Sequence, residues 1–481
     1  MNPTWCPNPI GAGALVALAL QGCSFAPPYH PPDPGPPPAK YKELGEWARA
    51  QPQDGEPRGT WWSLYHDPAL DALEDKVKSA NWSLKAAVAR LQQARAQYRV
   101  ARADLFPSLI ADPSATRERY SPNAPRSLPG FSTMYDDFVA GADFSYEIDL
   151  WGRVRNEVAA ARASRQASAA DLASIELSLR AQLAEDYFNL RALDAERQLL
   201  DKTVIDYAKS LELTTSLFDG GAAALADVAQ AQAQLDNART QAADIRLQRA
   251  QAEHAIAVLV GENPSTFSLP ANALPIDVTP PPIDPGLPST LLERRPDVAE
   301  AERRVAAANA QIGEARAAYF PRFTLMAAGG VESTRISNLF SLPSSFWSLG
   351  PQVSLPLFEG GRLRAQTAQA KAAYDEQLAD YRNTVLIAYQ DVEDNLAALR
   401  QLQEESATDA AAVQATGTAL DQAQQRYIAG IVTFLEVATA ETAALQAQLA
   451  AVSIQARRMA SSVLLVKALG GGWQSAALRE Q

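Results

Sequence analysis

The chain contains the same pattern twice. Residues 90–107 reappear as residues 304–321, roughly 210 positions later, with Arg, Ala, Gln, Phe and Pro at matching places. Residues 152–155, Gly-Arg-Val-Arg, likewise return at 361–364 as Gly-Arg-Leu-Arg. Each copy predicts a helix, a pair of strands, and then a long helix. One such copy cannot bury its own apolar faces, so the repeat predicts a pseudo-symmetric fold whose two halves pack side by side.

Two stretches in the repeats change from helical to alternating periodicity. Residues 138–150 and 347–357 alternate apolar with polar side chains, residues 323–331 supply another strand, and a less regular one lies near 109–120. Segments of about ten residues with one apolar face are typical of outer-membrane barrel walls, although a soluble sandwich also alternates. Four strands cannot close a barrel, and lipid does not tolerate open sheet edges. The strands are therefore either soluble or shared with other protomers in one barrel.

Long helices follow the strands. Residues 153–218 contain neither Pro nor Gly, which predicts about 100 Å of helix, and a second long helix is expected over 362–427, interrupted only by Gly417. Each is expected to turn back into a shorter helix, at 225–260 and 434–469. The turns contain Gly220, Gly221 and Gly430, as expected where a helical hairpin needs a left-handed residue.

The first 22 residues contain no Lys, Arg, Asp or Glu, and their apolar run ends in Leu20-Gln21-Gly22-Cys23. This pattern indicates a secretory signal, too short to span a bilayer. Its end resembles the lipobox of bacterial lipoproteins, in which Cys23 would be lipidated; the alternative is an ordinary signal peptide with an incidental Cys. Ser24 after the Cys favours export to the outer membrane. The processed chain keeps one Cys, which excludes an internal disulfide.

The remaining composition excludes several classes of function. A net charge of −12 argues against nucleic-acid binding, which needs a basic surface. Three His residues without a Cys cluster predict no metal site and no cofactor. We find no catalytic motif, so the chain is not expected to be an enzyme.

The predicted organisation follows directly from these segments. In chain order it is a signal peptide (1–22), a lipid-anchored Pro-rich tether (23–59), helices of the first repeat (60–105), strands 1 and 2 (106–150), a long helix with its hairpin helix (151–261), a linker (262–290), a helix of the second repeat (291–319), strands 3 and 4 (320–359), a second long helix with its hairpin helix (360–470), and a C-terminal tail (471–481).

Three motifs resemble a known family. They are Trp61-Trp62 with Asp67-Pro68, the run 146–155 (YEIDLWGRVR), and the run 291–298 (LLERRPDV) with its continuation to Pro321. The chain resembles the TolC-like outer membrane factors, in the lipoprotein branch associated with RND-type efflux pumps. The resemblance implies a mixed α+β membrane protein: a homotrimer with a twelve-stranded outer-membrane β-barrel, four strands per chain, on a long periplasmic barrel of helices.

The same resemblance implies function, partners and location. The protein would be the lipid-anchored outer-membrane exit duct for small molecules, with a periplasmic extension that meets an adaptor protein and an inner-membrane RND-type pump. One alternative is the duct of a type I protein or peptide secretion system. An alternative of another class is a structural coiled-coil lipoprotein of the envelope.

The family pattern also implies a periplasmic gate. It would include an acid after the first hairpin turn, Asp227, bonded to Tyr427 before the second turn, and a ring of acids to which Glu436 contributes. Thr439 and Val432 depart from the pattern at a second acidic and a basic position. The alternative for Asp227 and Glu436 is helix capping, worth about 0.3–1 kcal/mol.

Overall fold

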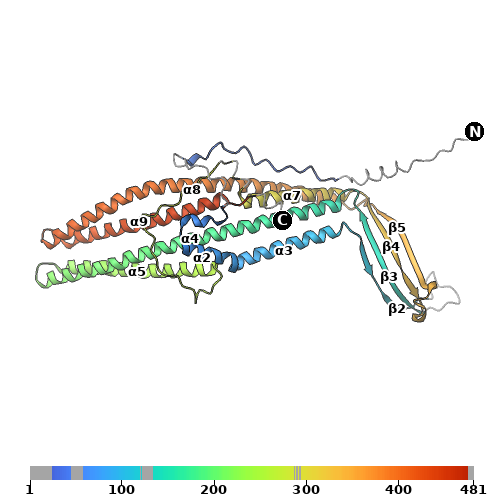
Figure 1. Cartoon of the computed structure of the whole chain (residues 1–481), viewed down its shortest axis with the longest axis horizontal. Helices are drawn as coiled ribbons and strands as arrows, with labels where there is room; N and C mark the ends of the chain where they lie inside the picture. The colour runs from blue at the N-terminus through green and yellow to red at the C-terminus, as the bar shows by residue number, and fades with distance from the viewer. Residues whose placement is uncertain are drawn as a thin grey trace, which may run out of the picture. The chain divides into compact units, whose positions relative to one another are not determined.

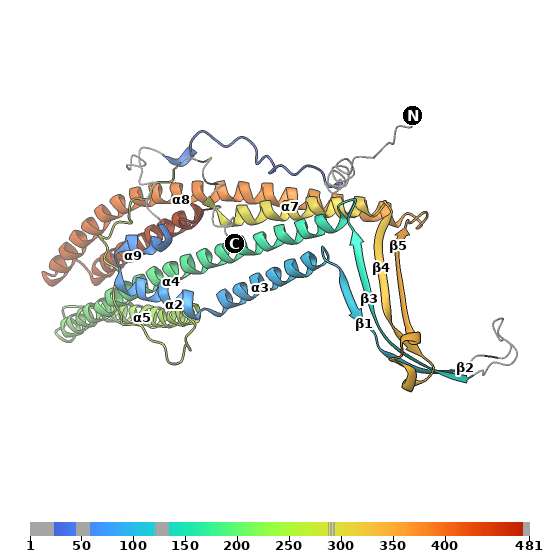
Figure 2. The same cartoon turned by 45° about the vertical axis from the view of Figure 1, so that its right-hand side comes forward.

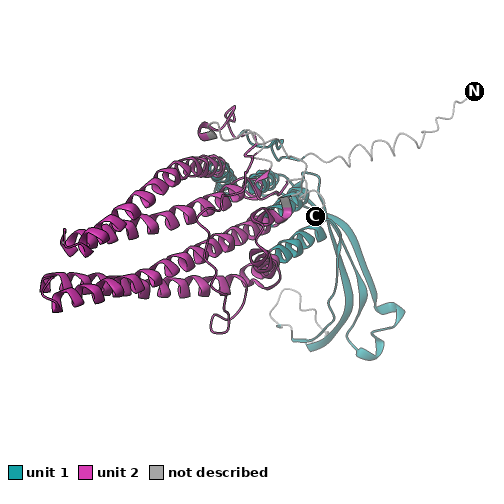
Figure 3. Ribbon diagram, turned by 60° about the vertical axis from the view of Figure 1, so that its left-hand side comes forward, with its two compact units in different colours: residues 1–33, 91–168, 301–381 teal, residues 34–90, 169–300, 382–481 magenta. Residues whose placement is uncertain are grey.

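The computed structural model describes residues 24–44, 58–119, 121, 134–286, 288, 291 and 294–474. The predicted signal peptide and Cys23 lie outside the described residues. Figure 3 shows two compact units built from alternating parts of the chain: unit 1 combines Met1–Asp33, Leu91–Ser168 and Ala301–Tyr381, and unit 2 combines Pro34–Arg90, Ala169–Glu300 and Arg382–Gln481.

Unit 1 contains an antiparallel sheet, shown in Figure 2. Its strands are β1 (Ser108–Ala111), β2 (Ser114–Arg119), β3 (Met134–Ile148), β4 (Arg322–Ser333) and β5 (Ser345–Ser354). β1 and β2 both pair with β3 in one continuous register and are separated by Asp112 and Pro113. Pro113 has no N–H for the ladder, which explains the break. The sheet therefore has the four predicted strand positions.

The register confirms the two predicted faces of the sheet. Phe144 lies opposite Leu109 and Ala327, and Ala327 lies opposite Leu349, so apolar residues share one face. Asp143 lies opposite Ala328, which lies opposite Ser348, on the other face. Because paired residues in an antiparallel sheet point the same way, the alternation seen in each strand extends across the sheet. The predicted fourth strand extended to residue 357, whereas β5 ends at Ser354.

The helices agree closely with their predicted bounds. The structure has α2 (Pro68–Ala80), α3 (Trp82–Ala103), α4 (Arg153–Asp219), α5 (Leu225–Leu259), α7 (Pro296–Ala317), α8 (Arg362–Ile428) and α9 (Phe434–Ala468), with short 3-10 segments at Lys42–Leu44, Arg58–Tyr65, Ile336–Asn338 and Leu342–Ser344. α4 and α8 both contain 67 residues. The second long helix runs over the predicted range, and α8 continues through Gly417 without a break. A single Gly costs a helix only about 1 kcal/mol relative to Ala. Asp67 caps α2, accepting a hydrogen bond from the Ala69 N–H at 2.9 Å.

In unit 2, α4 with α5 and α8 with α9 form two helical hairpins whose turns lie at one end (Figure 1). The turns are equivalent in detail. Gly221 and Gly430 have φ of 74° and 70°, and their N–H groups bond the carbonyls of Phe218 and Tyr427, both at 2.9 Å. Gly220 is not left-handed, so only one Gly in the first turn has the predicted role. The internal repeat therefore has a direct structural counterpart.

Among the helices in the described part of the chain, one, α9, is long and apolar enough to be considered a membrane span. In unit 2 it instead supplies core: Phe434, Val437, Val463 and Leu465 are all at most 2% exposed. Burial in the core of unit 2 therefore accounts for part of the apolar composition of α9.

The described part of the Pro-rich segment is docked against helices. In unit 1, Phe25 stacks on Phe320 at 4.3 Å between ring centroids, and Asn309 donates a hydrogen bond to the Pro27 carbonyl at 2.9 Å. In unit 2, Tyr41 is 1% exposed and the Lys42 N–H bonds the Glu393 carboxylate at 2.7 Å. The segment is extended as predicted, but packing fixes its position.

Candidate functional site

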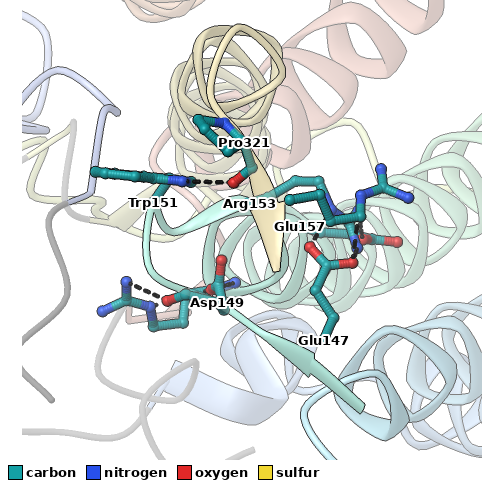
Figure 4. Close-up of polar contacts among 8 residues, drawn as sticks. Glu147, Asp149, Trp151, Arg153, Glu157 and Pro321 are labelled. Atoms are coloured by element: carbon teal, nitrogen blue, oxygen red, sulfur yellow. Dashed lines mark hydrogen bonds and ion pairs between the residues drawn. The ribbon is translucent and has the colours of Figure 1, made fainter. Parts of the chain in front are cut away.

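The run 146–155 forms the corner of unit 1 where β3 ends and α4 begins. Gly152 lies between them with φ of 78°. Arg153, the first residue of α4, bonds the Glu147 carboxylate through two nitrogens, both at 2.9 Å, and bonds Glu157 at 3.1 Å (Figure 4). A bidentate guanidinium–carboxylate pair fixes both the relative orientation of the two side chains and the distance between them. Arg153 therefore links the C-terminal end of β3 to the first turn of α4.

A second set of bonds strengthens the same corner. Asp149 accepts from the backbone N–H of Arg155 at 2.9 Å and from its side chain at 3.1 Å. The indole N–H of Trp151 donates to the Pro321 carbonyl at 2.7 Å (Figure 4), which ties this corner to the start of β4. The run 146–155, which carries part of the family resemblance, is thus a structural junction between β3, α4 and the start of β4.

The predicted gate residues gather at the hairpin end of unit 2. Tyr427 is 7% exposed and packs edge-on against Phe434 at 5.5 Å between ring centroids. Ala231, Val437 and Leu217 belong to the same apolar cluster, so α4, α5, α8 and α9 all contribute to it. Tyr427 is held by packing, since its hydroxyl has no hydrogen-bond partner within the described part of the chain.

Asp227 and Tyr427 do not form the expected bond in this conformation. The Asp227 carboxylate instead accepts from the backbone N–H of Ala224 at 3.2 Å, at the start of α5. This is the capping geometry that satisfies a free amide at a helix N-terminus. The geometry shows the capping role of Asp227.

Glu436 has a partner that the sequence reasoning missed. Arg426, in the last turn of α8, donates to the Glu436 carboxylate at 2.6 Å across the second hairpin turn. Both side chains are about half exposed. The signal was available, because a cation in a last helical turn and an acid in the next first turn each suit the helix dipole.

The two positions that depart from the family pattern have local partners. Thr439 donates its hydroxyl to the Leu435 carbonyl one turn earlier at 2.8 Å, and Val432 packs against the Tyr427 cluster. Neither residue carries charge. At this end of unit 2 the second hairpin therefore presents Arg426 and Glu436 as its charged pair.

The described residues contain no group of three or more His, Cys, Asp or Glu side chains placed to hold a metal ion. The predicted hairpin glycines, Asp227, Tyr427 and Glu436 all lie at one end of unit 2, although they are distant in sequence. This end of unit 2 therefore combines a buried aromatic contact, Tyr427 on Phe434, with a half-exposed ion pair, Arg426 with Glu436.

Comparisons with known proteins agree with these observations. The family model described as "Outer membrane efflux protein" matches residues 73–262 and 287–471, one segment for each repeat. The chain is 35% identical to the antibiotic efflux pump outer membrane protein ArpC of Pseudomonas putida, over 96% of this chain and 95% of that protein. It is 33% identical to the outer membrane protein OprJ of Pseudomonas aeruginosa, over 95% of each. Among solved structures, the outer-membrane channel OprN is similar with a TM-score of 0.86, at 31% identity over 94% of this chain and 100% of that one.

Proposed function

Since the chain belongs to the outer membrane efflux protein family and is an outer-membrane efflux channel, we propose that three copies form the exit duct of a tripartite efflux system. The observation that carries the trimer is the sheet of unit 1. It has four strand positions, an apolar face and two edges without a strand partner among the described residues. An open edge is unstable in lipid, and joining edges between copies removes it.

In this proposal, three sheets close one twelve-stranded barrel. The face with Phe144 and Leu349 would contact lipid, and the face with Asp143 and Ser348 would line the lumen. The long hairpins of unit 2 would form the periplasmic extension. The lipid on Cys23 would add a second membrane attachment.

The partners follow from the role of a passive exit duct. The relative ArpC is named as the outer membrane protein of an efflux pump, so we propose that a periplasmic adaptor connects the helical end of this duct to an inner-membrane RND-type pump. The substrates would be small molecules; the relative ArpC is named for antibiotic efflux. The protein would be a channel and not an enzyme.

We further propose that the hairpin end is the gate. The Arg426–Glu436 pair would hold the second hairpin in its resting form, and the Tyr427–Phe434 contact would fix the same turn from inside. Glu436 from three chains would contribute a ring of acids at the opening, each paired with Arg426 in the resting form. Asp227 would support the gate by capping α5, with its bond to Tyr427 confined to another conformation.

Two experiments test the duct and its gate. Heating should convert a detergent-resistant trimer to monomer, and expression should restore drug tolerance in a strain that lacks its own duct. If the protein were instead extracted from membranes without detergent, as an elongated soluble particle, the proposed β-barrel would be contradicted. For the gate, Arg426→Ala and Tyr427→Ala should each raise single-channel conductance in planar bilayers, because they remove the ion pair and the ring contact. Arg239→Ala, at an exposed residue on α5, should not. Unchanged conductance in both gate variants would place the closed state elsewhere.

A further inference from the structure

A groove of about 510 Å³ lies in unit 2 near the hairpin turns, lined by α4, α8 and α9. Its lining includes Tyr207 from α4, Tyr427 from α8 and Glu441 from α9, beside the apolar side chains of Phe434 and Val437. The volume is in the range that small ligands occupy in proteins. The groove lies within one protomer and shares Tyr427 and Phe434 with the proposed gate.

Glu441 is an unusual residue for such a place. It is 4% exposed, and one carboxylate oxygen accepts from the Ser210 hydroxyl at 2.8 Å, while the other has no hydrogen-bond partner in the described structure. Burial raises the pKa of this carboxyl above its ordinary value, although the Ser210 and Gln424 side chains favour its charged form. A buried acid that lacks a cation is destabilising, so a bound cation would relieve the cost.

Two phenols share the groove with this acid. Tyr207 and Tyr427 are 6% and 7% exposed, and neither hydroxyl has a partner among the described atoms. Both Tyr207 and Glu441 line the groove, and burial together with the Glu441 carboxylate raises the pKa of Tyr207. Buried polar atoms are almost always paired in folded proteins, so three unpaired ones lining one groove point to a missing ligand.

The internal repeat provides a comparison within the same chain. The positions equivalent to Glu441, Tyr427 and Tyr207 in the other repeat are Gln232, Phe218 and Thr416. Gln232 lies on an exposed face and bonds Asp236 in its own helix at 2.8 Å. The hairpin fold therefore forms without this acid and without these phenols, and folding alone does not account for them.

We propose that this groove binds an organic ammonium ion with a compact apolar body. The ammonium N–H groups would donate to the free Glu441 oxygen and to the two phenol oxygens, and the rings of Tyr207 and Tyr427 would attract the charge through their faces. Val437, Leu213 and Leu445 would contact the hydrocarbon part. At the rim, Lys209 is paired with Asp206 at 3.2 Å, so that lysine does not occupy the acid.

The test uses phenethylammonium chloride and the purified full-length protein in detergent, with binding followed by ligand-observed NMR. We expect saturable binding, and we expect 2-phenylethanol, its neutral analogue of the same shape, to bind roughly tenfold more weakly or worse. This comparison needs no variant. Equal binding of amine and alcohol, or no saturable binding of the amine, would overturn the proposal.

Variants locate the site. Glu441→Gln keeps the shape of the side chain and should weaken amine binding roughly tenfold or more, while Tyr207→Phe should weaken it several-fold. Asp236→Asn removes an exposed acid outside the groove and should leave binding unchanged. Trimer heat stability confirms that each variant is assembled. Full binding by assembled Glu441→Gln protein would exclude this site.

Discussion

Glu74 of α2 should make the stability of unit 2 depend on pH in the opposite sense to most acids. Its side chain is 0% exposed, and neither carboxylate oxygen has a hydrogen-bond partner in the described structure. The Arg180 guanidinium lies 3.8 Å away, too far for a hydrogen bond, and stacks on Trp62 instead. Burial raises the pKa of Glu74 from 4.5 to about 8, despite the opposing charge of Arg180.

The sign follows from proton binding. Between pH 4.5 and pH 8 the folded state keeps the Glu74 proton and the unfolded state has released it. The contribution of Glu74 to the free energy of unfolding is therefore fully present below pH 4.5, and it is lost as the pH rises to about 8. At about 1.4 kcal/mol per pH unit, the whole range corresponds to roughly 5 kcal/mol as an upper value.

Glu74→Gln removes the titration and keeps the shape of the protonated acid. We expect the variant and the parent protein to have similar stability near pH 5, and the variant to be more stable by several kcal/mol near pH 8.5. The assay is urea unfolding across this pH range, followed by tryptophan fluorescence, because Trp62 lies against Arg180. Asp244→Asn, which replaces an exposed acid on α5, is the control and should preserve the parent's pH dependence. Identical pH slopes in Glu74→Gln and parent protein would refute the reasoning.

Three further predictions concern other parts of the chain. Cys23→Ser should abolish palmitate labelling while the barrel still inserts; labelling that persists would refute the lipobox. Phe144→Arg should destabilise the inserted barrel by about 2–4 kcal/mol if its face contacts lipid, and so lower the yield of heat-modifiable trimer. Asp143→Arg, on the opposite face, should give a normal yield. Gly430→Ala should destabilise the second hairpin by roughly 1–2 kcal/mol because its φ is positive, but Gly417→Ala within α8 should stabilise it by about 1 kcal/mol, and denaturant midpoints distinguish the two.

The sequence by itself determined the elements and their faces. The long helices, their hairpin turns and the strand alternation depend on periodicity, on the absence of Pro and on single Gly residues, which act within a few residues of one another. The α4 and α8 bounds therefore differed from the prediction by about one residue, within the usual uncertainty of helix ends.

The tertiary structure decided which side chains meet. The sequence placed Asp227 and Tyr427 at the same end of the helices but could not show that Asp227 caps α5, or that Arg426 pairs with Glu436. It gave no sign that Glu441 is buried beside Tyr207, because Glu441 resembles many exposed acids on helices. Burial and pairing depend on the helix that lies opposite, and that neighbour comes from another part of the chain. Local pattern therefore fixed the shape of each element, whereas packing between distant segments fixed the chemistry of the tip.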